Sequence, residues 1–246
     1  MAMNPRLLRP RASGFDPRSI SNLQLWFDGA DASTITTVSG AVSQWNSKAG
    51  TGRNATQATA SSRPEYRASG MNGKGALYFN GTNNQLTTNY NASLIAGYVS
   101  YAIAVIPDEV MVDTRSQFEP VLFARNSSAN GIHVNTPASP NRWTLSHRNA
   151  LFNSIAGGTV AASRQVVLAT ISATTLTVRV NGAQGTQAGT FAAGSNETNA
   201  TFQIGQDGLQ QRWFAGVVAE ILMYDKTLTA AELSIIERYL SQKWGV

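Results

Sequence analysis

Cysteine is absent from this chain of 246 residues. Its absence excludes disulfides, thiolate nucleophiles and thiolate metal ligands, so the stability of the fold must come from packing. Charged residues are also scarce, at 13% of the sequence against roughly 25% in typical soluble domains. A chain with so few charges depends on Ser, Thr, Asn, Gln and Gly for its solubility, and these residues favour strands and turns over exposed helices.

Histidines and long apolar runs are equally sparse. The two histidines, His133 and His147, are too few for a histidine-based metal site, and we expect both to be surface residues of strands. No apolar run approaches the ~18 residues that cross a bilayer, and the first residues lack the apolar centre of a signal peptide. We therefore expect a protein that is made in the cytoplasm and binds no membrane.

Most of the positive charge lies at the N-terminus. Residues 1–18 hold four arginines and one aspartate, a net +3 out of the formal +5 of the chain. The rest of the sequence is nearly balanced and has no basic stripe interleaved with aromatic residues. We therefore expect no nucleic-acid binding by the domain.

Residues 4–15 contain two prolines and no strand or helix periodicity, so they should not fold alone. We assign residues 1–19 to an extended basic arm ahead of a single domain, residues 20–246. The arm is either a frayed terminus or a contact segment whose apolar side chains dock on a neighbouring protein while its guanidinium groups pair with carboxylates. The candidate contact residues are Arg6, Leu7, Leu8, Arg9, Arg11 and Phe15.

Short apolar segments separated by Gly- and Asn-rich turns fill the domain and predict an all-β fold, an antiparallel two-sheet sandwich. The longest apolar segment, residues 213–224, predicts a central strand covered on both faces. Asn181-Gly182 predicts a tight type I′ hairpin turn. One C-terminal helix, at about 229–243, is predicted by a capping box of Thr229 and Glu232 and by apolar residues at helical spacing.

A series of motifs runs in order along the domain, at residues 25–31, 42–45, 48–50, 53–55, 63–66, 181–182, 204–205, 214–220 and 239–245. These motifs resemble the concanavalin A-like and laminin-G-like jelly-roll domains of bacterial surface proteins and tailed-phage virions. The resemblance implies a concanavalin A-like jelly roll, but it specifies no single function because one fold hosts many activities. The arm segment at residues 6–17 resembles the leaders of phage structural proteins.

Hydrolases of this superfamily carry a Glu-x-Asp-x-x-Glu pattern on one strand, and retaining hydrolysis needs two carboxyl groups roughly 5–5.5 Å apart. Here Glu220 and Asp225 are five positions apart, which places them on opposite faces of a strand. We therefore expect no enzymatic activity and no cofactor. We interpret Glu220 as a structural carboxylate held by backbone amides or by an arginine such as Arg212.

Two other kinds of site are considered. Asp28 and Asp31 are candidate calcium ligands, although turn capping through Asx hydrogen bonds is the favoured alternative. Trp143, Trp213 and Tyr98 are candidate glycan contacts, although single aromatic residues in strands usually belong to the core.

The resemblance, the arm and the missing catalytic pair together predict a non-enzymatic phage structural protein, a capsid decoration or cement protein on the virion surface. Its expected partner is the major capsid protein or another virion protein, and family analogy implies a trimer. The alternative is a lectin-like tail or fibre protein that binds host-surface glycans. A glycosidase is the least favoured alternative.

Overall fold

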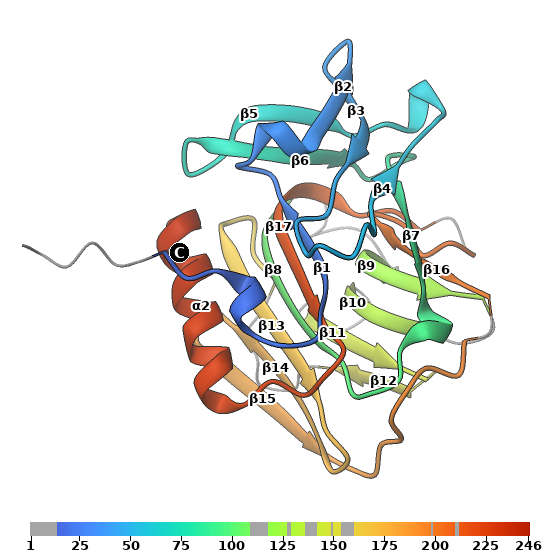
Figure 1. Cartoon of the computed structure of the whole chain (residues 1–246), viewed down its shortest axis with the longest axis vertical. Coiled ribbons are helices and arrows are strands. Elements are labelled where there is room, and N and C mark those ends of the chain that lie inside the picture. Colours follow the sequence, from blue (N-terminus) through green and yellow to red (C-terminus); the bar gives the residue numbers. More distant parts are fainter. Residues whose placement is uncertain are drawn as a thin grey trace, which may run out of the picture.

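The protein is described by a computed structural model, which covers residues 14–108, 118–126, 129–135, 142–148, 150–153, 160–197, 199–209 and 212–246. Within these ranges it is an antiparallel β-sandwich with one α-helix, at the C-terminal end (Figure 1). The predicted fold class is therefore confirmed. The arm residues Arg6, Leu7, Leu8, Arg9 and Arg11 lie outside the described residues.

The first sheet is centred on β17, whose ten residues are all buried, as the apolar run predicted. On one side of β17 the order is β15, β14, β13, β8, β17. On its other side, the C-terminal half of β17 pairs with β1, and its N-terminal half pairs with β6, which in turn pairs with β5. The strands are β1 (Leu23–Asp28), β5 (Glu65–Met71), β6 (Lys74–Asn80), β8 (Ser100–Pro107), β13 (Gln165–Ile171), β14 (Thr175–Val180), β15 (Ala183–Ala188) and β17 (Ala215–Tyr224).

The second sheet runs β12, β11, β10, β9, β16, β7, β4, β3, β2, and a pairing of β3 with β5 joins it to the first. Its strands are β2 (Ile35–Val38), β3 (Ala41–Trp45), β4 (Ala55–Thr56), β7 (Leu86–Asn91), β9 (Phe118–Arg125), β10 (Ala129–Asn135), β11 (Arg142–His147), β12 (Ala150–Asn153) and β16 (Thr201–Ile204). Short 3₁₀ turns are η1 (Pro17–Ser19), η2 (Ala32–Thr34), η3 (Ala60–Ser62) and η4 (Ala92–Leu94).

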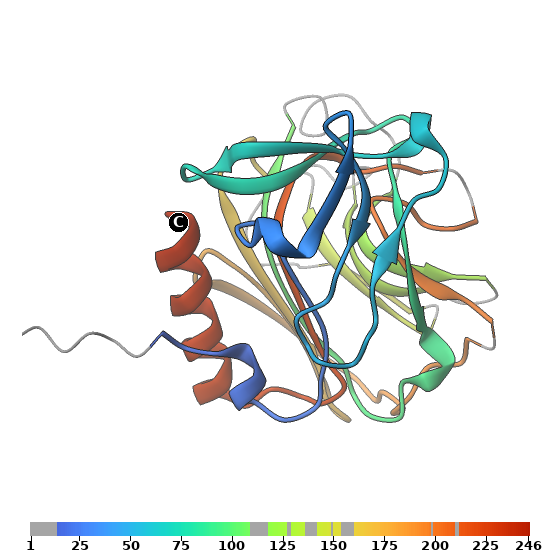
Figure 2. The same ribbon diagram turned by 45° about the horizontal axis from the view of Figure 1, so that its top comes forward.

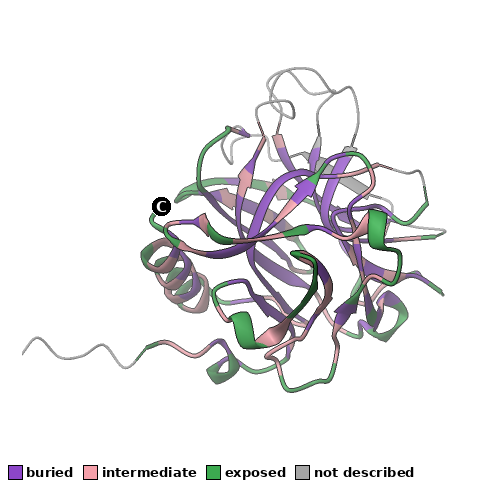
Figure 3. Ribbon diagram, turned by 90° about the horizontal axis from the view of Figure 1, so that it is seen from above, coloured by how far each residue is buried: buried purple, intermediate pink, exposed green. Residues whose placement is uncertain are grey.

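Two apolar cores result from this layering. The larger one lies between the sheets and includes Phe27, Trp45 and Trp143. The smaller one lies between the outer face of the first sheet and the helix α2 (Ala230–Trp244), and includes Trp26 and Trp244. The interior strands are accordingly buried, whereas exposed residues gather on turns and on the outer hairpins (Figure 3).

The local signals for the hairpin and the helix are confirmed. Asn181 and Gly182 join β14 to β15 with positive φ angles of 47° and 87°. Thr229 and Glu232 form both bonds of the capping box at the start of α2, and Gly245 ends the helix in the left-handed region. Within the part of the chain that the structure describes, no helix is long and apolar enough to span a membrane.

The N-terminal segment differs from the expectation of an arm up to residue 19. Asp16 caps η1, and the Tyr224 hydroxyl donates a hydrogen bond of 3.1 Å to the Pro17 carbonyl. Phe15 packs edge-to-face on Tyr239 of its own chain, with ring centroids 5.4 Å apart. The segment runs beside α2 in both views (Figures 1 and 2). The packed domain therefore includes Phe15, because the helix offers this ring an aromatic partner.

Candidate functional site

A buried carboxylate lies between the first sheet and α2. A bulge in the pairing of β17 with β8 falls at Ala219, after which Glu220 stands opposite Asp28 of β1. Both side chains therefore point toward the helix, and Glu220 is fully buried. Burial of a charged group is costly unless hydrogen bonds and a counter-charge satisfy it.

Three neutral donors and one cation satisfy Glu220. Trp26 Nε1 and the Tyr239 hydroxyl donate to Oε1 at 2.8 and 2.7 Å, and Trp244 Nε1 donates to Oε2 at 2.8 Å. Lys243 Nζ pairs with Oε2 at 2.7 Å. Burial raises the pKa of Glu220, and the Lys243 ammonium opposes this shift. Burial and then the nearby Glu220 carboxylate raise the pKa of Tyr239, so its hydroxyl keeps the proton that it donates.

The structural interpretation of Glu220 fits this geometry, but the expected partners were wrong. The charged groups that act on Arg212 are instead Asp207 and Arg125. The aromatic and ammonium partners come from β1 and from the C-terminal half of α2. Sequence patterns could not reveal them because the three segments meet only in the folded chain.

The calcium candidates belong to the same ionic network. Lys243 Nζ pairs with Asp28 Oδ1 at 2.7 Å, and Lys48 Nζ pairs with Asp28 and with Asp31, both at 2.9 Å. Asp28 also accepts a turn bond from the Ala30 amide, the favoured alternative. Within the described ranges, no three His, Cys, Asp or Glu side chains cluster as metal ligands. Ammonium groups hold the carboxylates of both aspartates.

The two carboxylates tested as a hydrolase pair have separate structural roles. Glu220 points toward α2, whereas Asp225 accepts hydrogen bonds from the backbone amides of Ala96 and Gly97, at 3.1 and 2.9 Å. Asp225 directly follows the last residue of β17, so the two carboxyl groups are held at different places in the fold.

The aromatic residues proposed as glycan contacts have different surroundings. Trp143 is fully buried in the inner core, where its Nε1 donates to Gln165 at 2.9 Å, so the prediction that it contacts a glycan was wrong. Tyr98 is half-buried and donates its hydroxyl to the Phe191 carbonyl at 3.2 Å. Trp213 is half-buried and forms an isolated bridge with Gln206.

Both histidines are buried, contrary to the expected surface positions. His133 Nε2 is 2.9 Å from Ser146 Oγ, and burial lowers the pKa of His133 to about 3. Burial also lowers the pKa of His147, whose Nε2 lies 2.8 Å from the Ala192 carbonyl. His133 is thus neutral at ordinary pH and acts as a core residue, because neighbouring strands supply hydrogen-bond partners that the sequence does not show.

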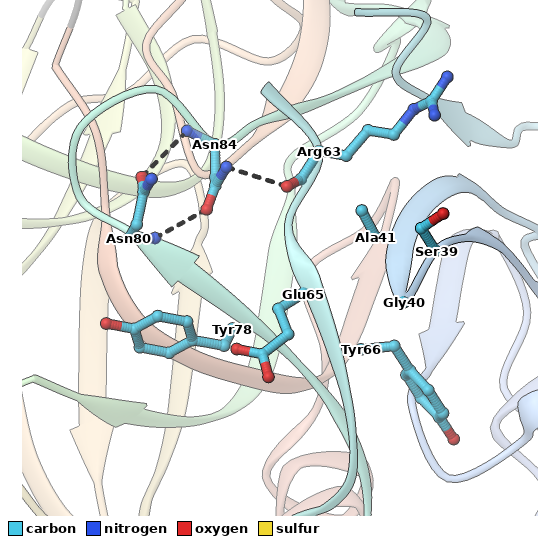
Figure 4. A pocket seen from close by; sticks show the side chains of 9 residues that line it. All are labelled: Ser39, Gly40, Ala41, Arg63, Glu65, Tyr66, Tyr78, Asn80 and Asn84. Atoms are coloured by element: carbon cyan, nitrogen blue, oxygen red, sulfur yellow. Dashed lines mark hydrogen bonds between the residues drawn. The ribbon is translucent and has the colours of Figure 1, made fainter. Parts of the chain in front are cut away.

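A surface pocket of about 430 Å³ lies over β5 and β6, beside the β2–β3 turn (Figure 4). Its walls combine aromatic, amide and charged groups. The lining residues are Ser39, Gly40, Ala41, Arg63, Glu65, Tyr66, Tyr78, Asn80 and Asn84.

Strand pairing arranges the charged wall of this pocket. Glu65 of β5 stands directly opposite Tyr78 of β6. The Arg67 guanidinium lies 3.6 Å from the centre of the Tyr78 ring, and its Nε donates to Glu65 Oε2 at 2.9 Å. These contacts restrain an exposed carboxylate beside an aromatic ring. Neither group was predicted as a site, because only the register of the two strands brings them together.

The amide wall is built from a side-chain-capped turn. Asn80 Oδ1 accepts from the backbone amides of Thr82, Asn83 and Asn84, and Asn84 Nδ2 donates to the Arg63 carbonyl at 3.0 Å. Glu65, by contrast, keeps 55% of its side-chain surface exposed. The amides therefore shape the pocket, and the Glu65 carboxylate is its accessible acidic group.

Comparison with known proteins agrees with the fold. A family model described as the concanavalin A-like lectin/glucanases superfamily matches residues 80–234, more than half of the chain. The chain belongs to this superfamily. No curated protein sequence matches it.

Solved structures similar to this superfamily member share its fold at low sequence identity. A sialidase of Trypanosoma rangeli has a TM-score of 0.60 and 16% identity over 91% of this chain, which spans only 33% of the sialidase. Domain 4 of AbnA, an arabinanase of Geobacillus stearothermophilus solved with arabinotriose, has a TM-score of 0.59 and 11% identity over 87% of this chain and 97% of that domain. The binding domain of Paraclostridial Mosquitocidal Protein 1 has a TM-score of 0.61 and 12% identity over 90% of this chain and 52% of that one.

Proposed function

We propose that this chain is a non-catalytic carbohydrate-binding domain, with the pocket over β5 and β6 as its glycan site. The observation that carries the proposal is the pairing of Glu65 with Tyr78 on the pocket wall, where Arg67 contacts both side chains. Sites for polar ligands need a few fixed polar groups beside an apolar surface, which these side chains supply. Arg67 covers one face of Tyr78, so a sugar would contact the part of the ring that lines the pocket and donate its hydroxyl groups to Glu65.

Two further observations support binding without hydrolysis. Among the described residues that line the pocket, Glu65 is the one carboxylate, whereas the usual glycosidase mechanism needs two. The similarity to AbnA domain 4 extends over nearly the whole of that domain, and that domain was solved with a trisaccharide.

The substitution Glu65→Gln tests the pocket directly. We expect it to weaken glycan binding by about tenfold or more, because a hydrogen bond to a charged group contributes about 1.5–3 kcal/mol. A glycan array would identify a ligand, with arabinotriose included as a probe, and calorimetric titration would measure the affinity of both proteins.

Glu237→Gln is the matched control, because Glu237 also pairs with an arginine, Arg179, but lies on α2. It should bind like the wild-type protein. An array without any bound glycan, or equal losses in the two variants, would contradict the proposal.

The second candidate is a decoration or cement protein on a phage capsid, with the virion surface as its location and the major capsid protein or another virion protein as its partner. It is favoured by the three arginines and the absence of acidic residues in residues 1–13, directly before the anchored Phe15. A trimer would match the family analogy.

Deletion of residues 1–13 tests this candidate and keeps the Phe15–Tyr239 contact. We expect the truncated protein to lose attachment to capsids in a co-sedimentation assay, while its melting temperature stays unchanged. Substituting alanine for Arg6, Arg9 and Arg11 should reproduce the loss. Full attachment of the truncated protein would exclude the arm as the capsid-binding element.

A further inference from the structure

A second hollow is lined by residues of the N-terminal segment and of α2, two elements that run side by side in Figure 2. This α2 groove has a volume of about 560 Å³, and the aromatic pair of Phe15 and Tyr239 forms part of its wall. The lining residues are Gly14, Phe15, Ile235, Arg238, Tyr239, Gln242 and Lys243.

The charges of α2 are satisfied at every position except one. Glu232 pairs with Lys226 and Glu237 with Arg179, both at 2.8 Å. Lys243 is held by Asp28 and Glu220, as described above.

The exception is Arg238, which is exposed at the α2 groove. Among the described residues, no carboxylate lies within ion-pair distance of its guanidinium. The groove therefore presents an unneutralised positive charge beside an apolar surface.

We propose that the α2 groove is a docking site for an acidic segment of a partner protein. An apolar side chain of the segment packs on Phe15 and Tyr239, and a carboxylate pairs with Arg238 through the fork of the guanidinium group.

The apolar wall favours a protein segment over a nucleic acid. A phosphate backbone is bound by several basic side chains arranged as a patch or stripe. In this groove Lys243 is already neutralised by Asp28 and Glu220, so the lining residues present one unpaired guanidinium beside two aromatic rings. The proposal is independent of the carbohydrate function, because the two pockets share no residue.

The test uses the full chain and a fluorescein-labelled peptide of alternating glutamate and leucine, measured by fluorescence anisotropy. We expect saturable binding that Arg238→Glu weakens by about tenfold or more, since close pairs of opposite charge lose their attraction on reversal. Arg148→Glu is the control, because it makes the same change of charge at the β11–β12 turn, away from α2. It should bind like the wild-type protein.

Four outcomes would overturn the proposal. The first three are no saturable binding of the peptide, equal losses of binding in the two variants, and duplex DNA that binds more tightly than the peptide and loses binding equally in Arg238→Glu. A second copy of this chain as the occupant would appear as a concentration-dependent dimer that Arg238→Glu dissociates, which also overturns it. Glu65→Gln should leave peptide binding unchanged, so a failure of the carbohydrate site and a failure of the groove are distinguishable.

Discussion

Replacing Lys243 with methionine is expected to lower the free energy of unfolding by about 3–5 kcal/mol, as for a buried ion pair that loses one partner. The substitution keeps an aliphatic side chain but leaves Glu220, which is fully buried, and Asp28 without their shared cation. Urea denaturation of both proteins, analysed as a two-state transition, would measure the difference.

Lys226→Met is the matched control, because Lys226 pairs with Glu232 where both side chains are 23% exposed. We expect it to cost about 1 kcal/mol or less, as a surface ion pair does. The double variant Lys243→Met, Glu220→Gln should recover part of the loss, because the amide carries no charge to leave unpaired. Equal losses for Lys243→Met and Lys226→Met would show that the buried network contributes no more than a surface pair.

The second large effect is expected at Trp143. Trp143→Ala should destabilise the protein by about 3–5 kcal/mol, since it removes a fully buried indole and leaves a cavity between the sheets. Trp143→Phe should cost less, about 1–3 kcal/mol, because it retains an aromatic ring but removes the hydrogen bond that the indole donates to Gln165 Oε1. Thermal or urea unfolding would rank the two variants.

Glycan binding distinguishes a core role of Trp143 from a role as a ligand contact. Measured at a temperature where the variant is folded, Trp143→Ala should bind glycans like the wild-type protein. If Trp143→Ala instead had the stability of the wild-type protein but lost glycan binding, Trp143 would be a contact residue and its assignment to the core would be wrong.

Elements with strong local signals were predictable. Residues close together in the sequence specify three of them: the apolar run that forms β17, the Asn181-Gly182 turn, and the capping box of Thr229 and Glu232. Phe15 was assigned to the arm because nothing near it in sequence indicates its partner, Tyr239, which is more than two hundred residues away. Trp143 was a candidate glycan contact, with the core as the alternative, because one aromatic residue in a strand does not reveal which face is covered; its burial shows that it belongs to the core.

The sequence by itself determined the all-β class, the single terminal helix and the lack of thiol chemistry, because periodicity, turn residues and composition are local properties. Tertiary structure alone decided that Glu65 faces Tyr78, that Glu220 is held by residues of β1 and α2, and that Arg238 has no carboxylate partner among the described residues. Those contacts depend on strand register and on the packing of the helix against the sheet. Both are set by the whole chain, and so are the two surfaces proposed for binding.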